Sequence, residues 1–378
     1  MNAMRALVGR RETRAAVVIW LAVPTLFLLF NLTLAVDPSA HLDKVSLGAV
    51  VLDTGVTTPQ GQVAVGPKLV GALEQRLGVQ MVPYPTEQAL RDAVLARQVA
   101  GGIVIPDGAT ANLQGGQPVE LRVVRSDAGD QFTNSLTANL AASLGPTLNT
   151  VLPAMLAGTQ PADPLVTVAT DTVATTPDFR FPALAGFLLL PLWMASVAFA
   201  VLLSRAGDAV RTVRGLVATA IAEVAVTVVG AAVTAAVVTL DVALFSWHWD
   251  IDFLGLFAFL WLACTAVGWL LLGTVRTFGL ELGALLGVVA LFLQQPISGA
   301  AYPPAFAPEI VRWAEPIAPL RYFVEGIRDV LIGGSTLPDM AIALVVIALA
   351  GLVLVVIGSG RLELLARRHP PAAAPVAS

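Results

Sequence analysis

Long apolar stretches with few charged residues are the feature that most limits how this chain can fold. Six of these stretches are close to the length of about 20 residues that an α-helix needs to cross a bilayer. They lie near residues 15–36, 182–204, 215–240, 253–275, 280–297 and 339–359. Charged residues make up only 13% of the chain, against about 25% in soluble globular proteins. The sequence therefore predicts a polytopic α-helical membrane protein with six transmembrane helices.

The first apolar stretch has the flanks of either a signal peptide or an anchor. Four arginines precede it within residues 1–14, as in the charged region of a signal peptide. Its apolar part is longer than the core of a signal peptide, however, and no small-residue cleavage site follows it. We therefore expect residues 15–36 to stay in the protein as the first transmembrane helix.

The arginines also predict the orientation of the chain. They cluster in residues 1–14, in the connection 204–215, at Arg276 and in the tail 360–378, which all fall on one side of a six-helix model. Because positively charged connections stay in the cytoplasm, both termini are expected there and residues 37–181 outside. The alanine- and valine-rich, lysine-poor composition is typical of a GC-rich bacterium, so we expect the bacterial plasma membrane. The proline- and alanine-rich end of the tail is expected to be disordered.

Residues 37–181, between the first and second predicted spans, have the pattern of a small α/β domain. Alternating apolar residues predict strands, and apolar residues on one helical face predict helices. The expected strands are 44–53, 79–84, 101–106 and 119–124, and the expected helices are 66–78, 86–98 and 130–156. Thr86 is the expected N-cap of the second helix. The long helix 130–156 is expected to lead the chain back toward the membrane.

The segment QQPISGAAYPPAF, residues 294–306, breaks the apolar pattern before the last predicted span. Its prolines and glycine cannot continue a helix through lipid. Residues 308–315 and 320–331 then have the pattern of two amphipathic half-helices, near 306–332, at the outer membrane surface. The candidate residues of a lid on the outer mouth of a transport path are Pro296, Tyr302, Pro303, Pro304, Arg321, Glu325 and Arg328. We expect the last three on the polar side of the second half-helix; alternatively, the segment is only a structural cap.

Two glutamates lie within the predicted spans. Glu223 is inside the third span, where an ionisable residue is a candidate proton carrier or a polar contact with a partner. Alternatively, it forms a hydrogen bond within the bundle, for example to an arginine. Glu281 lies near the start of the fifth span and is expected to pair with Arg276.

The fifth predicted span also has glycines at four-residue spacing, at Gly279, Gly283 and Gly287. Residues with this spacing lie on one face of a helix and let another helix approach closely. The pattern therefore predicts helix packing, either within the bundle or between two copies of the chain.

Missing motifs exclude several classes of enzyme. The lysines Lys44 and Lys68 do not follow a glycine, as the lysine of a phosphate-binding P-loop does. The sequence LDTG at 52–55 resembles the turn of aspartic proteases, but a second such turn is missing. Cys264 is the only cysteine, so a cysteine metal cluster is excluded, and the three histidines are scattered. The tryptophans around His248 are typical of the membrane interface, which favours an interfacial anchor over a metal site there. No basic and aromatic pattern indicates nucleic acid.

The order of these elements resembles that of type-2 ABC transporter permeases. Those proteins have a cytoplasmic N-terminus, one span, a large outer domain and five further spans, with paired half-helices before the last. More narrowly, the chain is similar to the YhgE/Pip (phage infection protein) branch. The segments that carry the resemblance are VSLGAVVLDTG, VGPKLVGALEQRLG, ARQVAGGIVIPDG and QPISGAAYPPAFAPEIVRWAEPIAPLRYFVEGIRDVLIGG.

The resemblance implies a permease subunit of an exporter for a hydrophobic, drug-like or lipid cargo, embedded in membrane lipid as a homodimer or a paired permease. A separate ATPase subunit would bind ATP and Mg²⁺, and this chain would hold no cofactor. The candidate residues for coupling to that ATPase are Arg205, Asp208, Arg211 and Arg214. Alternatively, these residues only orient the chain, and the protein is an envelope receptor or secretion accessory that works without an ATPase.

Overall fold

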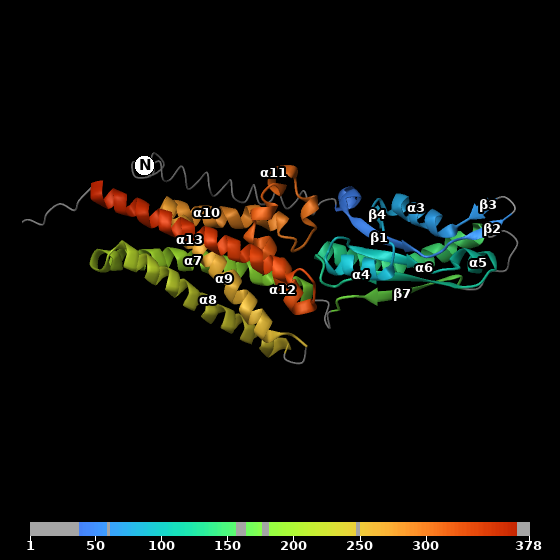
Figure 1. Cartoon of the computed structure of the whole chain (residues 1–378), viewed down its shortest axis with the longest axis horizontal. Helices are drawn as coiled ribbons and strands as arrows, with labels where there is room; N and C mark the ends of the chain where they lie inside the picture. The colour runs from blue at the N-terminus through green and yellow to red at the C-terminus, as the bar shows by residue number, and fades with distance from the viewer. Residues whose placement is uncertain (1–37, 59–60, 156–163, 176–180, 247–249, 369–378) are drawn as a thin grey trace, which may run out of the picture.

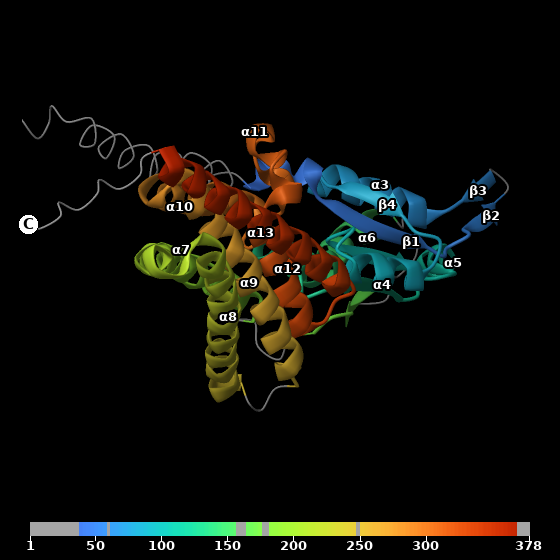
Figure 2. The ribbon, with the colours of Figure 1, turned by 60° about the vertical axis from the view of Figure 1, so that its left-hand side comes forward.

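The computed structural model describes residues 38–58, 61–155, 164–175, 181–246 and 250–368. These residues form an α/β domain and a bundle of long helices, which lie end to end (Figure 1). The view in Figure 2 shows the same two parts, with the α/β domain beside only one end of the bundle. The predicted first span, 15–36, lies outside the described residues, and so do the tryptophans around His248.

The α/β domain is built on a five-stranded sheet with the strand order β4-β1-β5-β6-β7. Strands β5 and β6 pair antiparallel, and the other neighbours pair parallel. The strands are β1 (Ser46–Val51), β4 (Gln80–Pro83), β5 (Gly101–Ile105), β6 (Val119–Arg125) and β7 (Val166–Thr172). A short helix η1 (Pro38–Lys44) precedes the sheet, and β2 (Val56–Thr58) and β3 (Gly61–Val63) form a separate antiparallel pair.

Helices cover both faces of this sheet. They are α3 (Val65–Leu77), α4 (Glu87–Leu95), α5 (Ala109–Gln114) and α6 (Gln131–Met155). Alternate residues of each strand point to opposite faces, so Leu47 and Ile103 pack with α3, α5 and α6, whereas Val50 and Val104 pack with α4. Thr86 caps α4 as predicted, because its hydroxyl accepts a hydrogen bond from the backbone N–H of Ala89 at 3.1 Å.

The direction of α6 corrects the sequence analysis, whereas the LDTG sequence has only the structural role that the missing second turn indicates. The helix α6 begins beside the bundle, where the N–H of Phe132 donates to the carbonyl of Ala301 at 3.0 Å. It therefore leads the chain away from the bundle, and the unpredicted strand β7 brings it back (Figure 1). Asp53 of the LDTG sequence is buried and accepts hydrogen bonds from the N–H groups of Thr110, at 3.1 Å, and Gly66, at 3.3 Å, so here it holds a loop in place.

In the bundle, five helices of the described part are long and apolar enough to cross a membrane. They are α7 (Phe181–Arg214), α8 (Leu216–Ser246), α9 (Phe253–Phe278), α10 (Leu280–Gln294), which η2 (Gln295–Ile297) continues, and α13 (Leu337–Arg368). In the most apolar window of each, α9 buries 56% of its residues and the others 22–28%. The helix α9 is therefore the centre around which the others pack.

The connection predicted at 204–215 is helical in the structure. The helix α7 continues without a break to Arg214, and only Gly215, with φ +84°, separates it from α8. Glycine adopts this left-handed conformation without the steric cost of a Cβ. The end of α7 is therefore a helical extension of the bundle, not a loop.

Two of the three glycines predicted to form one packing face do so in α10. The side of Gly283 lies so close to the backbone of α9 at Val275 that no Cβ fits there, and Gly287 faces Leu271 and Val197. Gly279 does not belong to that face, because it ends α9 with φ +92° and precedes the first turn of α10. The close packing is between helices of the same chain.

A second set of glycines, which the sequence analysis missed, brings α13 against α9. A Cβ on Gly351 of α13 would lie 2.5 Å from the backbone nitrogen of Leu270, and one on Gly273 of α9 would lie 2.6 Å from the carbonyl oxygen of Gly351. Neither backbone can yield without moving a whole helix. The contact therefore depends on both glycines.

This packing predicts opposite effects for the same substitution at two positions of α13. Gly351→Ala is expected to destabilise the bundle by about 1–3 kcal/mol through overpacking. Gly360→Ala meets nothing within 4 Å and is expected to be neutral or to stabilise by up to about 1 kcal/mol, because alanine favours the helix. Thermal unfolding of both variants in detergent checks this, and equal shifts would contradict the assigned packing.

Candidate functional site

Three charged side chains meet inside the bundle at the end far from the α/β domain. Arg276 of α9 is 6% exposed and Glu223 of α8 is 3% exposed. Arg276 donates two hydrogen bonds to the Glu223 carboxylate, from Nε to Oε2 at 3.0 Å and from Nη2 to Oε1. It also donates from Nη1 to Oδ1 of Asp208 on α7 at 2.8 Å, and from Nη2 to the carbonyl of Ser204 at 3.4 Å. We call Ser204, Asp208, Glu223 and Arg276 the distal ion network.

The distal ion network fixes the end of α7 to the two helices beside it. A buried carboxylate is tolerated when a cation and hydrogen bonds compensate for its lost hydration, and the fork of an arginine does both. Gly207 leaves the space for this contact, because a Cβ there would collide with the side chains of Glu223 and Arg276. The Asp208 side chain is 50% exposed, so the network reaches the surface on the α7 side.

The structure gives different surroundings to the charged residues that the sequence analysis named in this part of the chain. Glu223 bonds an arginine within the bundle, which is the second of the two interpretations given for it. The expected pair of Glu281 with Arg276 is wrong, since Arg276 bonds Glu223 and Asp208, and Glu281 is exposed in the first turn of α10. Among the coupling candidates, Arg205 is exposed, and the side chains of Arg211 and Arg214 lie outside the described part.

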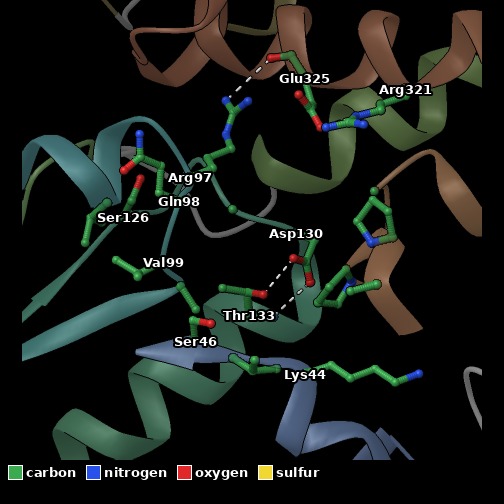
Figure 3. Close-up of a pocket in the computed structure, with 18 of the residues that line it drawn as sticks. Lys44, Ser46, Arg97, Gln98, Val99, Ser126, Asp130, Thr133, Arg321 and Glu325 are labelled. Atoms are coloured by element: carbon green, nitrogen blue, oxygen red, sulfur yellow. Dashed lines mark hydrogen bonds and ion pairs between the residues drawn. The ribbon is translucent and has the colours of Figure 1, made fainter. Parts of the chain in front are cut away.

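A polar cavity of about 360 Å³ lies between the α/β domain and the bundle. We call it the interdomain cavity. On the bundle side it is bounded by the segment that follows α10, which contains η3 (Pro304–Phe306), α11 (Glu309–Arg312), η4 (Glu315–Ile317) and α12 (Pro319–Ile332). Figure 3 shows Arg97, Ser126 and Asp130 of the α/β domain on one side of it, and Arg321 and Glu325 of α12 on the other.

Arg97 connects the two parts of the molecule across this cavity. It forms an ion pair with Asp329 of α12, whose side chain is fully buried, and donates to the hydroxyl of Thr336 at 3.3 Å. It also adopts φ 55°, in the left-handed region that a non-glycine residue rarely occupies. Such strain persists only where surrounding contacts determine the conformation. The Arg97–Asp329 pair is therefore a structural joint between the α/β domain and α12.

The charges in the cavity are unevenly compensated. Burial alone would lower the pKa of Arg321, but its ion pairs with Glu325, at 3.2 Å, and Glu315, at 2.5 Å, raise it instead. Arg328 is 2% exposed, and burial lowers its pKa to about 10. Burial also raises the pKa of Asp130, although Thr133 donates two hydrogen bonds to its carboxylate. Arg328 thus remains the less compensated of the two arginines.

The structure brings five of the seven lid candidates to the interdomain cavity. They are Pro303, Pro304, Arg321, Glu325 and Arg328. Arg328 does not lie on the exposed side of its half-helix as predicted, because it is buried and donates to the carbonyls of Gly299, at 2.6 Å, and Ala300, at 2.7 Å. The sequence analysis missed Arg97 and Asp130, since nothing near either residue signals a partner more than a hundred positions away.

The other two candidates lie outside the cavity. Pro296 is buried in η2, and Tyr302 contacts the α/β domain through Phe132, with ring centroids 6.0 Å apart. Phe306 packs beside them, 5.2 Å from Phe132 and 5.4 Å from His41 between ring centroids. The segment that breaks the apolar pattern is therefore the packed contact between the α/β domain and the bundle.

A second cavity, of about 380 Å³, lies among α7, α8 and α9. Its walls are mostly apolar or small, with Leu192, Phe199, Gly230 and Gly268 among them, and Thr227 is one of its polar residues. It lies along the part of these helices that is long and apolar enough to be within a membrane. An apolar molecule or an acyl chain has suitable dimensions for such a cavity.

Comparisons with known proteins identify relatives of the chain. A family model described as "ABC-2 family transporter protein" matches residues 15–359. Among solved structures, a domain of a candidate ABC type-2 transporter from Thermotoga maritima MSB8 is 20% identical, with a TM-score of 0.27, over 34% of this chain and 86% of that chain. The curated proteins include no match.

Proposed function

The chain belongs to the ABC-2 family of transporter proteins, and we propose that it is the membrane-spanning permease subunit of an ABC-type exporter. A separate ATPase subunit, which binds ATP and Mg²⁺, powers the export. The positive-inside rule puts Arg205, the end of α9 at Arg276 and both termini on the cytoplasmic side of the membrane of a bacterial cell. The α/β domain then lies outside the plasma membrane, and two copies, or this chain and a paired permease, form the path.

The distal ion network is the observation that supports coupling to an ATPase. The end of α7 is the helical extension in which Arg205 and Asp208 lie, and Arg276 joins it to the centre of the bundle. A force applied to this extension by a docked ATPase would therefore reach α8 and α9 through hydrogen bonds within a buried network. A flexible loop would transmit such a force poorly.

The cavity among α7, α8 and α9 supports a hydrophobic, drug-like or lipid cargo. Its apolar walls favour an apolar ligand by the hydrophobic effect. At the end of α9, Arg276 bonds α8 and α7, which are the other two helices around this cavity. A change in the position of α7 relative to α8 would alter the shape of this cavity. Cargo release and ATP hydrolysis are thereby connected.

The double variant Asp208→Ala, Arg211→Ala tests the proposed coupling. The full chain is produced in its native host, and the ATPase that copurifies with it and the ATP turnover of the complex are measured. We expect the variant to insert into the membrane as well as the wild type and to lose about tenfold in ATP turnover, as one charge-assisted hydrogen bond is worth about 1.5–3 kcal/mol. Unchanged turnover would refute the assigned coupling role.

Asp241→Ala is the matched control for this experiment. It removes an exposed carboxylate from α8 near the opposite end of the bundle, and we expect it to leave ATP turnover unchanged. If the wild type copurifies with no ATPase at all, the exporter proposal fails. That result would favour a YhgE/Pip-like receptor or secretion accessory, in which the α/β domain carries the function.

A further inference from the structure

The interdomain cavity is lined by an excess of cationic side chains. Five of its side chains are cations and three are carboxylates. The carboxylates of Glu315 and Glu325 both pair with Arg321. Asp329, behind the cavity wall, pairs with Arg97 and offsets one more positive charge. Of the remaining cations, Lys44 is exposed, and Arg312 has its partner Glu309 largely in solvent, with 92% of that side chain exposed.

Arg328 is a buried cation of the cavity that forms no ion pair with a carboxylate of the described residues. Its two short hydrogen bonds go to backbone carbonyls, and no ion pair within the described residues joins it to Asp130, which interacts with it electrostatically. Burial is the main cause of its lowered pKa, and the positive charge of Arg97 adds to it, against the opposite effects of Asp130, Glu325 and Asp329. A bound anion would stabilise such a guanidinium more than one that already pairs with a carboxylate.

Unsatisfied donors occur at the same place. Among the described residues, the buried Nε atoms of Arg97, Arg312 and Arg328 have no hydrogen-bond partner. All three arginines line the interdomain cavity. A buried N–H without an acceptor costs about 1–3 kcal/mol, so a ligand that brings acceptor oxygens into this cavity would stabilise these arginines.

We propose that the interdomain cavity binds a phosphate group, which either a lipid headgroup or a soluble phosphorylated compound carries. Arginine forks match the oxygens of a phosphate in geometry and charge. The volume of about 360 Å³ is at the lower end of the range for small-molecule sites and leaves room for atoms attached to the phosphate. This binding does not depend on transport and needs neither an ATPase nor ATP.

Titration calorimetry with hexyl phosphate tests the proposal directly. The purified full chain is titrated in detergent with hexyl phosphate and, for comparison, with hexanol, which has the same apolar tail and no charge. Arg312→Gln is expected to weaken hexyl phosphate binding about tenfold, the effect of one charge-assisted hydrogen bond. Glu315→Gln is expected to strengthen it at least about threefold, because it frees Arg321 from one of its carboxylates.

Arg122→Gln is the matched control, since Arg122 is a half-exposed arginine of β6 that pairs with Glu87 and does not line the cavity. It should bind hexyl phosphate like the wild type. Equal binding of hexyl phosphate and hexanol would overturn the proposal, and so would equal losses in Arg312→Gln and Arg122→Gln. Because both variants change side chains that are partly exposed, neither result depends on disrupting a buried residue.

Nanodiscs distinguish the two sources of the phosphate. The same titration is repeated in nanodiscs of digalactosyldiacylglycerol, a bilayer lipid without phosphate, with and without phosphatidylglycerol. If the anionic lipid competes, the apparent affinity for hexyl phosphate falls, and the natural ligand is a lipid headgroup. An affinity that does not change supports a soluble phosphorylated compound, and absence of hexyl phosphate binding in every condition would refute both.

Discussion

Replacing Arg276 with methionine is expected to destabilise the bundle by about 3–5 kcal/mol. The change leaves the Glu223 carboxylate buried without its cation, and such an uncompensated charge is far more costly than the loss of a contact. Asp208 loses its bond to α9 at the same time. Thermal unfolding of the purified chain in detergent measures the effect.

Two further variants show whether the buried charge causes this loss. The double variant Glu223→Leu, Arg276→Met removes both charges and should recover most of the stability, because apolar residues often replace a buried ion pair at little cost. Arg361→Met removes an exposed arginine at the same end of the bundle, which donates to the carbonyl of Thr277, and should have a small effect. A double variant as unstable as Arg276→Met would show that packing, not charge, is responsible.

The double variant also separates a structural role of the distal ion network from a role in coupling. If the network only stabilises the fold, the apolar replacement should keep the ATP turnover of the assembled complex. If the network transmits movement of α7, turnover should fall although the protein is stable. The second outcome is the one that the proposed function requires.

Local patterns in the sequence predict most elements of this fold. The strands β1, β4, β5 and β6, the helices α3, α4 and α6, and the second half-helix α12 all fall where apolar periodicity and capping residues place them. In each of them, local spacing and burial agree. The strand β7 was missed because only its first residue, Val166, is buried, and its other residues are small, polar or partly exposed, which leaves a weak apolar pattern.

The contacts of the candidate site could not be predicted in the same way, because they join positions far apart in the chain. Arg276 and Glu223 are separated by 53 positions, and Arg97 and Asp329 by 232. Each charge on its own fits an anchor, a cap or an exposed face equally well. Only the packing of α8 against α9, and of the α/β domain against α12, selects the partners.

Replacing Arg97 with alanine is expected to loosen the α/β domain from the bundle and to lower the free energy of unfolding by about 2–3 kcal/mol. Asp329 loses its cation in a position where its side chain is fully buried. The cost is smaller than for Arg276, because the N–H and hydroxyl of Thr336 still donate to this carboxylate at 2.9 and 2.7 Å. Hydrogen exchange should increase in α12 and at the end of α4, and remain unchanged in α9.

Comparison of Arg97→Ala with Arg97→Gly isolates the backbone strain at this position. Both variants lose the ion pair, but glycine adopts the left-handed conformation of Arg97 without the steric cost of about 1–2 kcal/mol that an L-residue has there. The glycine variant should therefore be the more stable of the two. Arg91→Ala, which removes an arginine that pairs, among the described residues, with carboxylates of the α/β domain, is the control. If Arg97→Ala changes hydrogen exchange in α12 no more than Arg91→Ala does, Arg97 is not the joint between the two parts, and the packing of Phe306 and Tyr302 against Phe132 must hold them together alone.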